Sequence, residues 1–195
     1  MKKVLLILLC SVLLMSCKKH VDVKEVAKLN VENTISTDRQ YMYLNYGDDY
    51  RWYETCILLK NFLDEDCDGT IEEISSVFQV VTQIDSTSFD TQVIMTNHTL
   101  DGSQTDVKEG FWVEDYPINN DSIISFKEAF DKLMATNCVK PHSRHCVLRK
   151  EVGRYDVNPQ YIFGNTKAQV YVDAVNGNVN EKNPAFVGGP LGEWP

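Results

Sequence analysis

The residues from Ser125 to Asn137 carry the pattern that most constrains how this chain can fold, an amphipathic helix with a marked beginning and end. Ser125 and Glu128 fit a capping box, in which each side chain accepts a hydrogen bond from an N–H group at the helix start. Apolar residues then recur at helical spacing and share one face: Phe126, Ala129, Phe130, Leu133 and Met134. We expect the helix to end near Asn137, ahead of Pro141, and its apolar face to lie against a sheet.

The segments that follow this helix predict strands. Residues 146–152, 159–164 and 168–174 are short and rich in β-branched and aromatic residues. The last of these segments runs into Asn176 and Gly177, a pair that supplies the positive φ angles of a tight hairpin turn. This order predicts the α+β class, with an antiparallel sheet packed by one main helix.

The part of the chain before the helix predicts further strands. Residues 77–83 and 90–97 have strand-like composition, and Asp101 and Gly102 mark a turn after them. Residues 111–118 indicate another strand. Antiparallel pairing between neighbours along the chain is the simplest arrangement for these segments.

Residues 41–63 are unusually rich in aromatic side chains. Aromatic residues favour strands, so we interpret this stretch as packed strands. A platform for a sugar or a peptide remains the alternative. The side chains concerned are Tyr41, Tyr43, Tyr46, Tyr50, Trp52 and Tyr53.

The order of one helix, several strands and a closing hairpin resembles the PepSY domain, a small extracytoplasmic module. In that family a helix opens with Ser-x-x-Glu-Ala, and the last strand ends in a pattern like Val-Tyr-Val-Asp-Ala-x-Thr-Gly-x-Val. The match spans residues 121–180, with Asn176 where Thr is usual, at Ser125, Glu128, Ala129, Val170, Tyr171, Val172, Asp173, Ala174, Gly177 and Val179. The resemblance implies a binding or inhibitory module, of the kind found in protease propeptides and envelope proteins, without catalytic residues.

The N-terminus predicts export and lipidation. Two lysines precede an apolar core of 12 residues at 4–15, shorter than the roughly 20 residues that a membrane-spanning helix needs. The stretch from Leu14 to Cys17 resembles the lipobox of bacterial lipoproteins, which implies cleavage before Cys17 and acylation of that residue. We therefore expect a lipid-anchored protein of the bacterial cell envelope. The outer membrane is favoured, the side of the membrane stays open, and a soluble secreted protein is the alternative.

The net charge argues against nucleic acid as a partner. The whole chain carries −9, and without residues 1–16 it has 17 basic and 28 acidic residues, which gives −11. Binding to nucleic acid needs clustered Lys and Arg, so we expect none. The sequence contains no Gly-x-Ser-x-Gly, His-Glu-x-x-His or phosphate-binding Gly loop, so no cofactor is expected.

Four cysteines remain after Cys10 leaves with the signal peptide and Cys17 is acylated. An even number of cysteines outside the cytoplasm predicts disulfides, and four cysteines allow three pairings. The short separations in sequence favour the bonds Cys56–Cys67 and Cys138–Cys146.

Two histidines lie between the last two cysteines. Cys138, His142, His145 and Cys146 have the residue types of a tetrahedral zinc site. Their spacing matches no common zinc motif, so we interpret the segment as a disulfide that closes a polar turn after the helix.

The acidic stretch at 64–73 matches the first half of an EF-hand calcium loop. The matching residues, at positions 1, 3, 5 and 6 of that loop, are Asp64, Asp66, Asp68 and Gly69. Position 12 needs a bidentate carboxylate, and Ser75 stands there. We therefore interpret the stretch as a solvated turn between strands, with calcium binding as the alternative.

These patterns divide the chain into five parts. They are a signal peptide at 1–16, the lipidated cysteine and a tether at 17–38, a mostly β part at 39–120 that is able to form a second sheet, a PepSY-like unit at 121–182, and a flexible tail at 183–195.

The sequence predicts two classes of function. The first is a lipid-anchored binding module that inhibits or chaperones an envelope protein, such as a protease or another hydrolase. The alternative is a calcium-dependent or carboxylate-based hydrolase that uses acids such as Glu114 and Asp115. Adjacent residues on a strand point to opposite faces, which weakens that alternative.

Overall fold

The structure is a computed structural model that describes residues 28–185, apart from 65, 85, 120–121 and 154–155. The expected signal peptide, the expected acylation site Cys17 and residues 186–195 of the expected tail lie outside the described residues.

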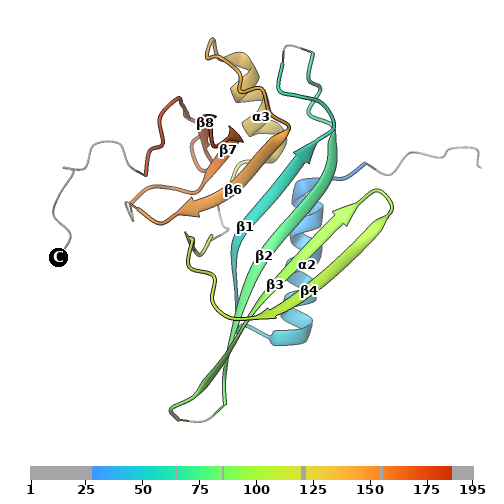
Figure 1. Cartoon of the computed structure of the whole chain (residues 1–195), viewed down its shortest axis with the longest axis vertical. Helices are drawn as coiled ribbons and strands as arrows, with labels where there is room; N and C mark the ends of the chain where they lie inside the picture. Colours follow the sequence, from blue (N-terminus) through green and yellow to red (C-terminus); the bar gives the residue numbers. More distant parts are fainter. Residues whose placement is uncertain (1–27, 65, 85, 120–121, 154–155, 186–195) are drawn as a thin grey trace, which may run out of the picture.

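The described part of the chain contains two helices and nine strands (Figure 1). The helices are α2 (Val31–Tyr46) and α3 (Phe126–Ala135). The strands are β1 (Tyr50–Leu59), β2 (Ile71–Gln83), β3 (Phe89–Thr99), β4 (Gly102–Glu109), β5 (Asp115–Tyr116), β6 (His145–Glu151), β7 (Gln160–Asn165), β8 (Ala168–Asp173) and β9 (Val179–Asn180).

The strands form one antiparallel sheet in the order β4-β3-β2-β1-β6-β7-β8-β9, and the short β5 pairs with β6. The segments 39–120 and 121–182 meet where β1 pairs with β6, at residues 54–58 and 145–149. The predicted α+β class with an antiparallel sheet is therefore confirmed. The N-terminal strands extend the same sheet and do not form a second one.

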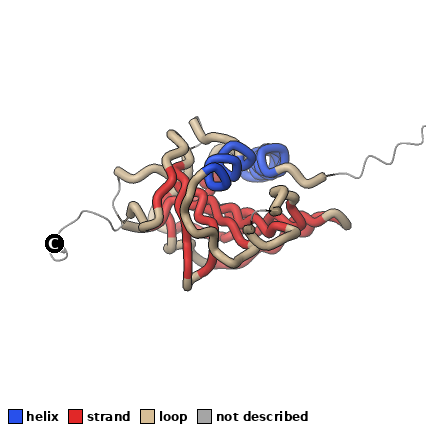
Figure 2. Tube along the Cα trace, turned by 90° about the horizontal axis from the view of Figure 1, so that it is seen from above, coloured by secondary structure: helices blue, strands red, loops and turns tan. Residues whose placement is uncertain are grey.

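Both helices lie on one face of this sheet (Figure 2). Helix α2 packs against β1 and β2, and α3 packs against β8. The core lies between the helices and the sheet, and its largest fully buried side chains are Tyr161, Phe78, Phe163, Met42, Ile57, Leu59, Ile74, Ile94, Leu133 and Leu148. The opposite face, to which alternate strand residues such as Glu54 and Cys56 point, is called the open face below.

Helix α3 has the cap and the buried face that the sequence predicts. The Glu128 N–H donates to Ser125 Oγ (3.1 Å). The residues buried on its inner face are Phe126, Ala129, Phe130 and Leu133. The helix ends at Ala135, slightly before the expected end. The Glu128 carboxylate lies 3.6 Å from Lys132 Nζ, so it forms an ion pair along the helix.

Helix α2 corrects the expected tether and the expected strands at 41–63. Residues 31–38 are helical, and so are residues 41–46 with their three tyrosines. The helix begins because the Asn33 N–H donates to Asn30 Oδ1 (2.8 Å), which caps the first turn. Its few apolar contacts include Val31 and Met42, which are buried. The tether can therefore extend no further than the residues before α2, and a second helix joins the predicted one on the sheet.

Two turns and one strand that the sequence predicts can be compared with the structure. The Asp101-Gly102 turn is confirmed, and it leads into β4, a strand that the sequence pattern did not predict. The strand expected at 111–118 is reduced to the two residues of β5. In the hairpin after β8 Gly177 has a positive φ (73°) and Asn176 does not. The Asp173 carboxylate accepts the N–H groups of Val175 and Asn176 in this turn.

Candidate functional site

A groove of about 590 Å³ lies between the first turns of α2 and α3. We call it the α2–α3 groove. Its apolar lining includes Ile71, Phe126 and Phe130, and all three side chains are mostly buried. Leu100, from the β3–β4 turn, is 56% exposed at its edge. The floor can therefore receive an apolar group.

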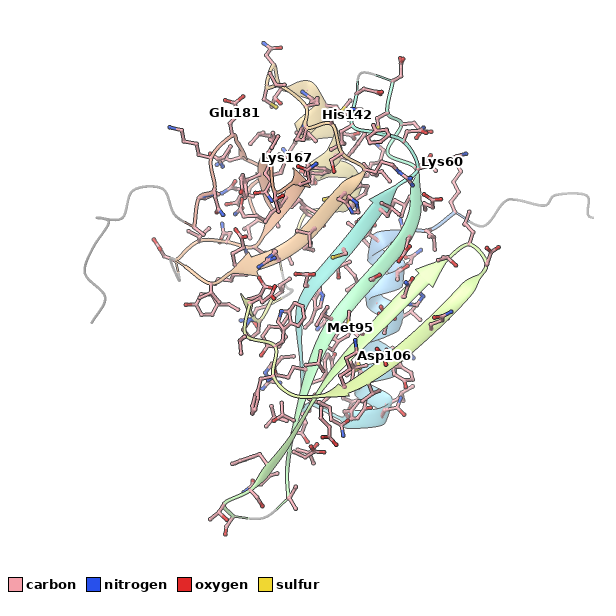
Figure 3. All side chains as sticks on the ribbon, in the orientation of Figure 1. Lys60, Met95, Asp106, His142, Lys167 and Glu181 are labelled. Atoms are coloured by element: carbon pink, nitrogen blue, oxygen red, sulfur yellow. The ribbon has the colours of Figure 1, made fainter. Side chains whose placement is uncertain are left out.

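Three lysines from separate elements line the rim of the α2–α3 groove: Lys28, Lys60 and Lys127. Lys127 is 2.5 Å from Asp131 in an ion pair on α3. Among the described residues, Lys28 and Lys60 form no ion pair with a carboxylate within 4.0 Å. Lys60 stands at the end of β1 (Figure 3). The groove lining also carries acids, so its charge is mixed, and Lys28 and Lys60 are the cations that an acidic group could reach. These acids are Glu32, Asp68, Glu72 and Asp131.

Glu32 joins the two helices that form the groove. The Phe126 N–H, at the start of α3, donates to Glu32 Oε1 (2.6 Å) on α2. An acidic group is favourable there because the first N–H groups of a helix have no partner within the helix. Glu32 therefore links the two walls of the groove directly.

A second hollow of about 460 Å³ shares Val31 and Glu32 with the α2–α3 groove. Three of the six aromatic residues that the sequence singles out line this hollow, namely Tyr43, Tyr50 and Trp52. Tyr43 comes from α2 and the other two come from β1, so a helix and a strand bring together residues from the stretch that was expected to form packed strands.

On the open face, two carboxyl groups meet beside one arginine. Arg149 Nε donates to Asp115 Oδ1 (2.7 Å), and Arg149 Nη1 lies 3.6 Å from Glu54 Oε2. Trp112 Nε1 donates to Asp115 Oδ2 (3.0 Å), and the Cys56 thiol donates to Glu54 Oε1 (3.1 Å). Glu54 and Asp115 are both buried. We call these five residues the open-face cluster.

Burial shapes the electrostatics of the open-face cluster. It raises the pKa of Glu54, and the Asp115 charge adds to that rise while the Cys56 hydrogen bond and Arg149 oppose it. Burial likewise raises the pKa of Asp115 against the opposing effects of Trp112 and Arg149. Both carboxyl groups therefore hold a proton more readily than in water, and Arg149 is the counter-charge that favours their ionised forms.

The cluster also corrects the carboxylate pair suggested by the sequence. Asp115 works with Glu54, from β1, while its neighbour Glu114 contributes its backbone carbonyl oxygen to Arg149 (3.4 Å). Glu54 and Arg149 are opposite each other in the β1–β6 register. No local spacing could have identified Glu54, because the pairing of distant strands brings it to Asp115.

The acidic stretch at 64–69 lies in the loop between β1 and β2. The Thr70 N–H and hydroxyl donate to the two oxygens of Asp68 (2.9 and 2.8 Å), and Gly69 has φ 71°. The first of these hydrogen bonds is the main cause that lowers the pKa of Asp68. The Asp66 N–H donates to Asp64 Oδ1 (3.1 Å). The aspartate oxygens therefore stabilise the loop between the antiparallel strands β1 and β2.

The four expected disulfide cysteines are free thiols in the structure. Ile57 points into the core, so its neighbour Cys56 points to the open face, whereas Cys67 is buried in the core. Because Cys56 and Cys67 lie on opposite sides of the sheet, the expected Cys56–Cys67 bond is not formed. The Cys138 sulfur lies 2.8 Å from Thr136 Oγ1, and Cys146 is buried in β6. The expected Cys138–Cys146 bond is therefore not formed either.

His142 and His145 also have separate surroundings. The His142 ring stacks on Phe62, with 4.3 Å between ring centroids and 4° between planes. His145 is exposed at the start of β6. In the described part of the chain, no group of three or more His, Cys, Asp or Glu side chains is placed to hold a metal ion.

Comparisons of the chain with family models, with curated proteins and with solved structures found no match. Neither α2 nor α3, the helices of the described residues, is long and apolar enough to cross a membrane.

Proposed function

We propose that this protein is a lipid-anchored, PepSY-like binding module of the bacterial envelope. It holds an extended segment of a partner protein in the α2–α3 groove. The observation that carries the proposal is the groove itself, which has an apolar floor and is lined by Lys28 and Lys60, two lysines that form no ion pair within 4.0 Å with another described residue. The matching segment presents an apolar side chain to Phe130 and an acidic side chain to Lys28 or Lys60.

The anchor and the partner class rest on sequence resemblance. The lipobox-like residues Leu14 to Cys17 support acylation and an envelope location, with the outer membrane favoured. The PepSY-like pattern at 121–180 supports inhibition or chaperoning of an envelope protease or another hydrolase. The pattern begins with α3, which forms one wall of the groove.

The carboxylate-based alternative has weaker support from the geometry. The Asp68 oxygens accept hydrogen bonds from Thr70, and the Asp115 carboxylate accepts hydrogen bonds from Arg149 and Trp112. A general base needs a carboxylate that can reach the substrate proton. Binding through the groove is therefore the function that we propose.

The test compares capture of envelope proteins by the tagged full chain and by charge-reversed variants. Lys60→Glu places a negative charge on the groove rim and should reduce capture of an acidic segment about tenfold or more. Lys167→Glu is the matched control, because Lys167 lies in the exposed β7–β8 turn away from the groove (Figure 3). The captured proteins are identified by mass spectrometry and assayed for hydrolase activity with and without the full chain.

A partner that is lost with Lys60→Glu and retained with Lys167→Glu supports the proposal. Equal capture by both variants, or capture of nothing above background, overturns the groove as the binding site. Hydrolase activity of the purified chain alone would favour the alternative.

A further inference from the structure

Strand β4 forms a long free edge of the sheet. It pairs with β3 on one side only, and it is the first strand in the sheet order. All eight of its residues are exposed, so neither helix covers it. A free edge of this kind presents unpaired backbone groups to another strand. The open question is which strand fits it.

The hydrogen bonds to β3 determine which backbone groups face outward. The Gly110 N–H donates to Thr91 O (3.0 Å) and fixes the alternation, so even-numbered residues of β4 bond to β3. The N–H and C=O groups of the odd-numbered residues point to the free edge: Ser103, Thr105, Val107 and Glu109. A second antiparallel strand must satisfy these groups.

The charges of β4 are self-complementary around Val107. Asp106 and Lys108 lie on the open face, opposite Met95 and Val93 of β3, and the first of these pairs is seen in Figure 3. A two-fold axis through Val107 places Asp106 of each copy opposite Lys108 of the other, which gives two cross-strand ion pairs. An axis at Asp106 would oppose two aspartates, and an axis at Thr105 would leave both charges without an opposite charge.

We propose that two copies of this chain associate through β4, in antiparallel register centred on Val107, to form one continuous sheet. In this register the outward groups of Val107 bond to those of its counterpart, and those of Thr105 bond to Glu109. Asp106 and Lys108 occupy the closer, non-hydrogen-bonded pairs, where cross-strand charges interact most strongly. Within one copy Lys108 Nζ already lies 3.2 Å from Asp106 Oδ2, so the dimer would place two such ion pairs side by side.

Cysteine cross-linking in intact cells tests both the contact and its register. The full chain carries Cys56→Ser, because Cys56 is exposed, together with Val107→Cys or Thr105→Cys. In the proposed register, two residues at 107 have Cα atoms about 5.5 Å apart, within disulfide range. Two residues at 105 are about 13 Å apart along the strands and cannot be bridged. We expect at least a roughly tenfold excess of cross-linked dimer for Val107→Cys.

Charge exchange provides the second arm, in the Val107→Cys background. Asp106→Lys opposes two pairs of like charges and should reduce the dimer about tenfold. Asp106→Lys combined with Lys108→Asp restores opposite charges across the interface and should restore the dimer. Melting of each variant shows whether the fold is retained.

Each outcome decides the proposal separately from the groove. Preferential dimer with Thr105→Cys overturns the register, and a folded Val107→Cys chain that stays monomeric overturns self-association. Cross-linking to a different protein shows that β4 takes a partner's strand and also overturns it. Partner capture that depends on Lys60 tests only the groove.

Discussion

Arg149 is the residue on which the open-face cluster depends most. It is the positive group between two buried carboxyl groups, and its side chain is 21% exposed. Burial raises the pKa of both acids even with Arg149 in place. A raised carboxyl pKa means that stability is greatest below the ordinary carboxyl pKa and falls as pH rises through the raised value.

We predict that Arg149→Leu lowers the free energy of unfolding by about 2–4 kcal/mol at pH 7, because two buried carboxylates lose their counter-charge. The loss should be smaller near pH 4, where protonated carboxyl groups need no cation. Urea unfolding at the two pH values measures the difference.

The double variant Arg149→Leu with Glu54→Gln is the matched comparison, since Glu54→Gln removes one charge and keeps the shape of the side chain. The second change should recover part of the stability that Arg149→Leu loses at pH 7 and little near pH 4. An equal loss for Arg149→Leu at both pH values, with no recovery, would show that Arg149 contributes through packing alone.

At the scale of elements, α2 is held by buried polar contacts as well as by its apolar residues. Asp38 is buried, and it accepts a hydrogen bond from the Thr96 hydroxyl (2.6 Å) and lies 2.7 Å from His98 Nε2. Glu32 accepts the Phe126 N–H and connects α2 to α3. The groove therefore depends on hydrogen bonds that hold its two walls in place.

We predict that Glu32→Ala lowers the free energy of unfolding by about 1–2 kcal/mol, because an N–H group at the start of α3 loses its acceptor. Thermal or urea unfolding measures this loss. Capture of a partner through the groove should weaken in parallel, since the helices lose their direct link.

Glu128→Ala is the control for an acid in the first turn of α3. Its side chain is about half exposed and forms only an ion pair with Lys132, while its backbone N–H keeps the Ser125 cap. The expected loss is about 0–0.5 kcal/mol. Losses of the same size for Glu32→Ala and Glu128→Ala would contradict a special role of Glu32.

At the scale of the whole molecule, one sheet unites both halves of the chain. The β1–β6 pairing joins the N-terminal strands to the strands that follow α3, and the helices cover one face across both halves. The α2–α3 groove lies at the start of α2, directly after the segment that would lead to the lipid anchor. The proposed binding site and the proposed anchor are therefore close along the chain.

We predict that Cys17→Ala moves the protein from the membrane fraction to the soluble fraction, or stops its correct localisation, because the acyl chains supply the membrane affinity. Fractionation followed by immunoblotting measures this, and labelled fatty acid measures acylation. Cys56→Ser, which leaves the lipobox intact, should remain in the membrane fraction. Absence of label from the wild-type chain would contradict the anchor.

Local patterns in the sequence were sufficient to predict α3 and many of the strands. The cap at Ser125 and the spacing of Phe126, Phe130 and Leu133 are properties of neighbouring residues, and so is the alternation within strands. The turn at Asp101 and Gly102 was predictable for the same reason, since a tight turn depends on residues a few positions apart.

Helix α2 and β4 were missed because their own patterns are weak. Asp38 looks like a surface residue of a tether, and it is buried only because β3 supplies Thr96 and His98 as partners. Strand β4 is exposed on both faces, so it lacks the alternation that identifies a half-buried strand. Their assignment depends on contacts with β3 that sequence periodicity does not encode.

The sequence by itself determined the α+β class, the capped α3 and the antiparallel strands around it, because short-range hydrogen bonding and periodic burial encode them. Only the tertiary structure decided that the two halves share one sheet and that Asp115 meets Glu54 on the open face of that sheet. It also decided that Cys56 and Cys67 lie on opposite sides of that sheet. These features follow from the register between distant strands, which places residues on a face irrespective of their separation along the chain.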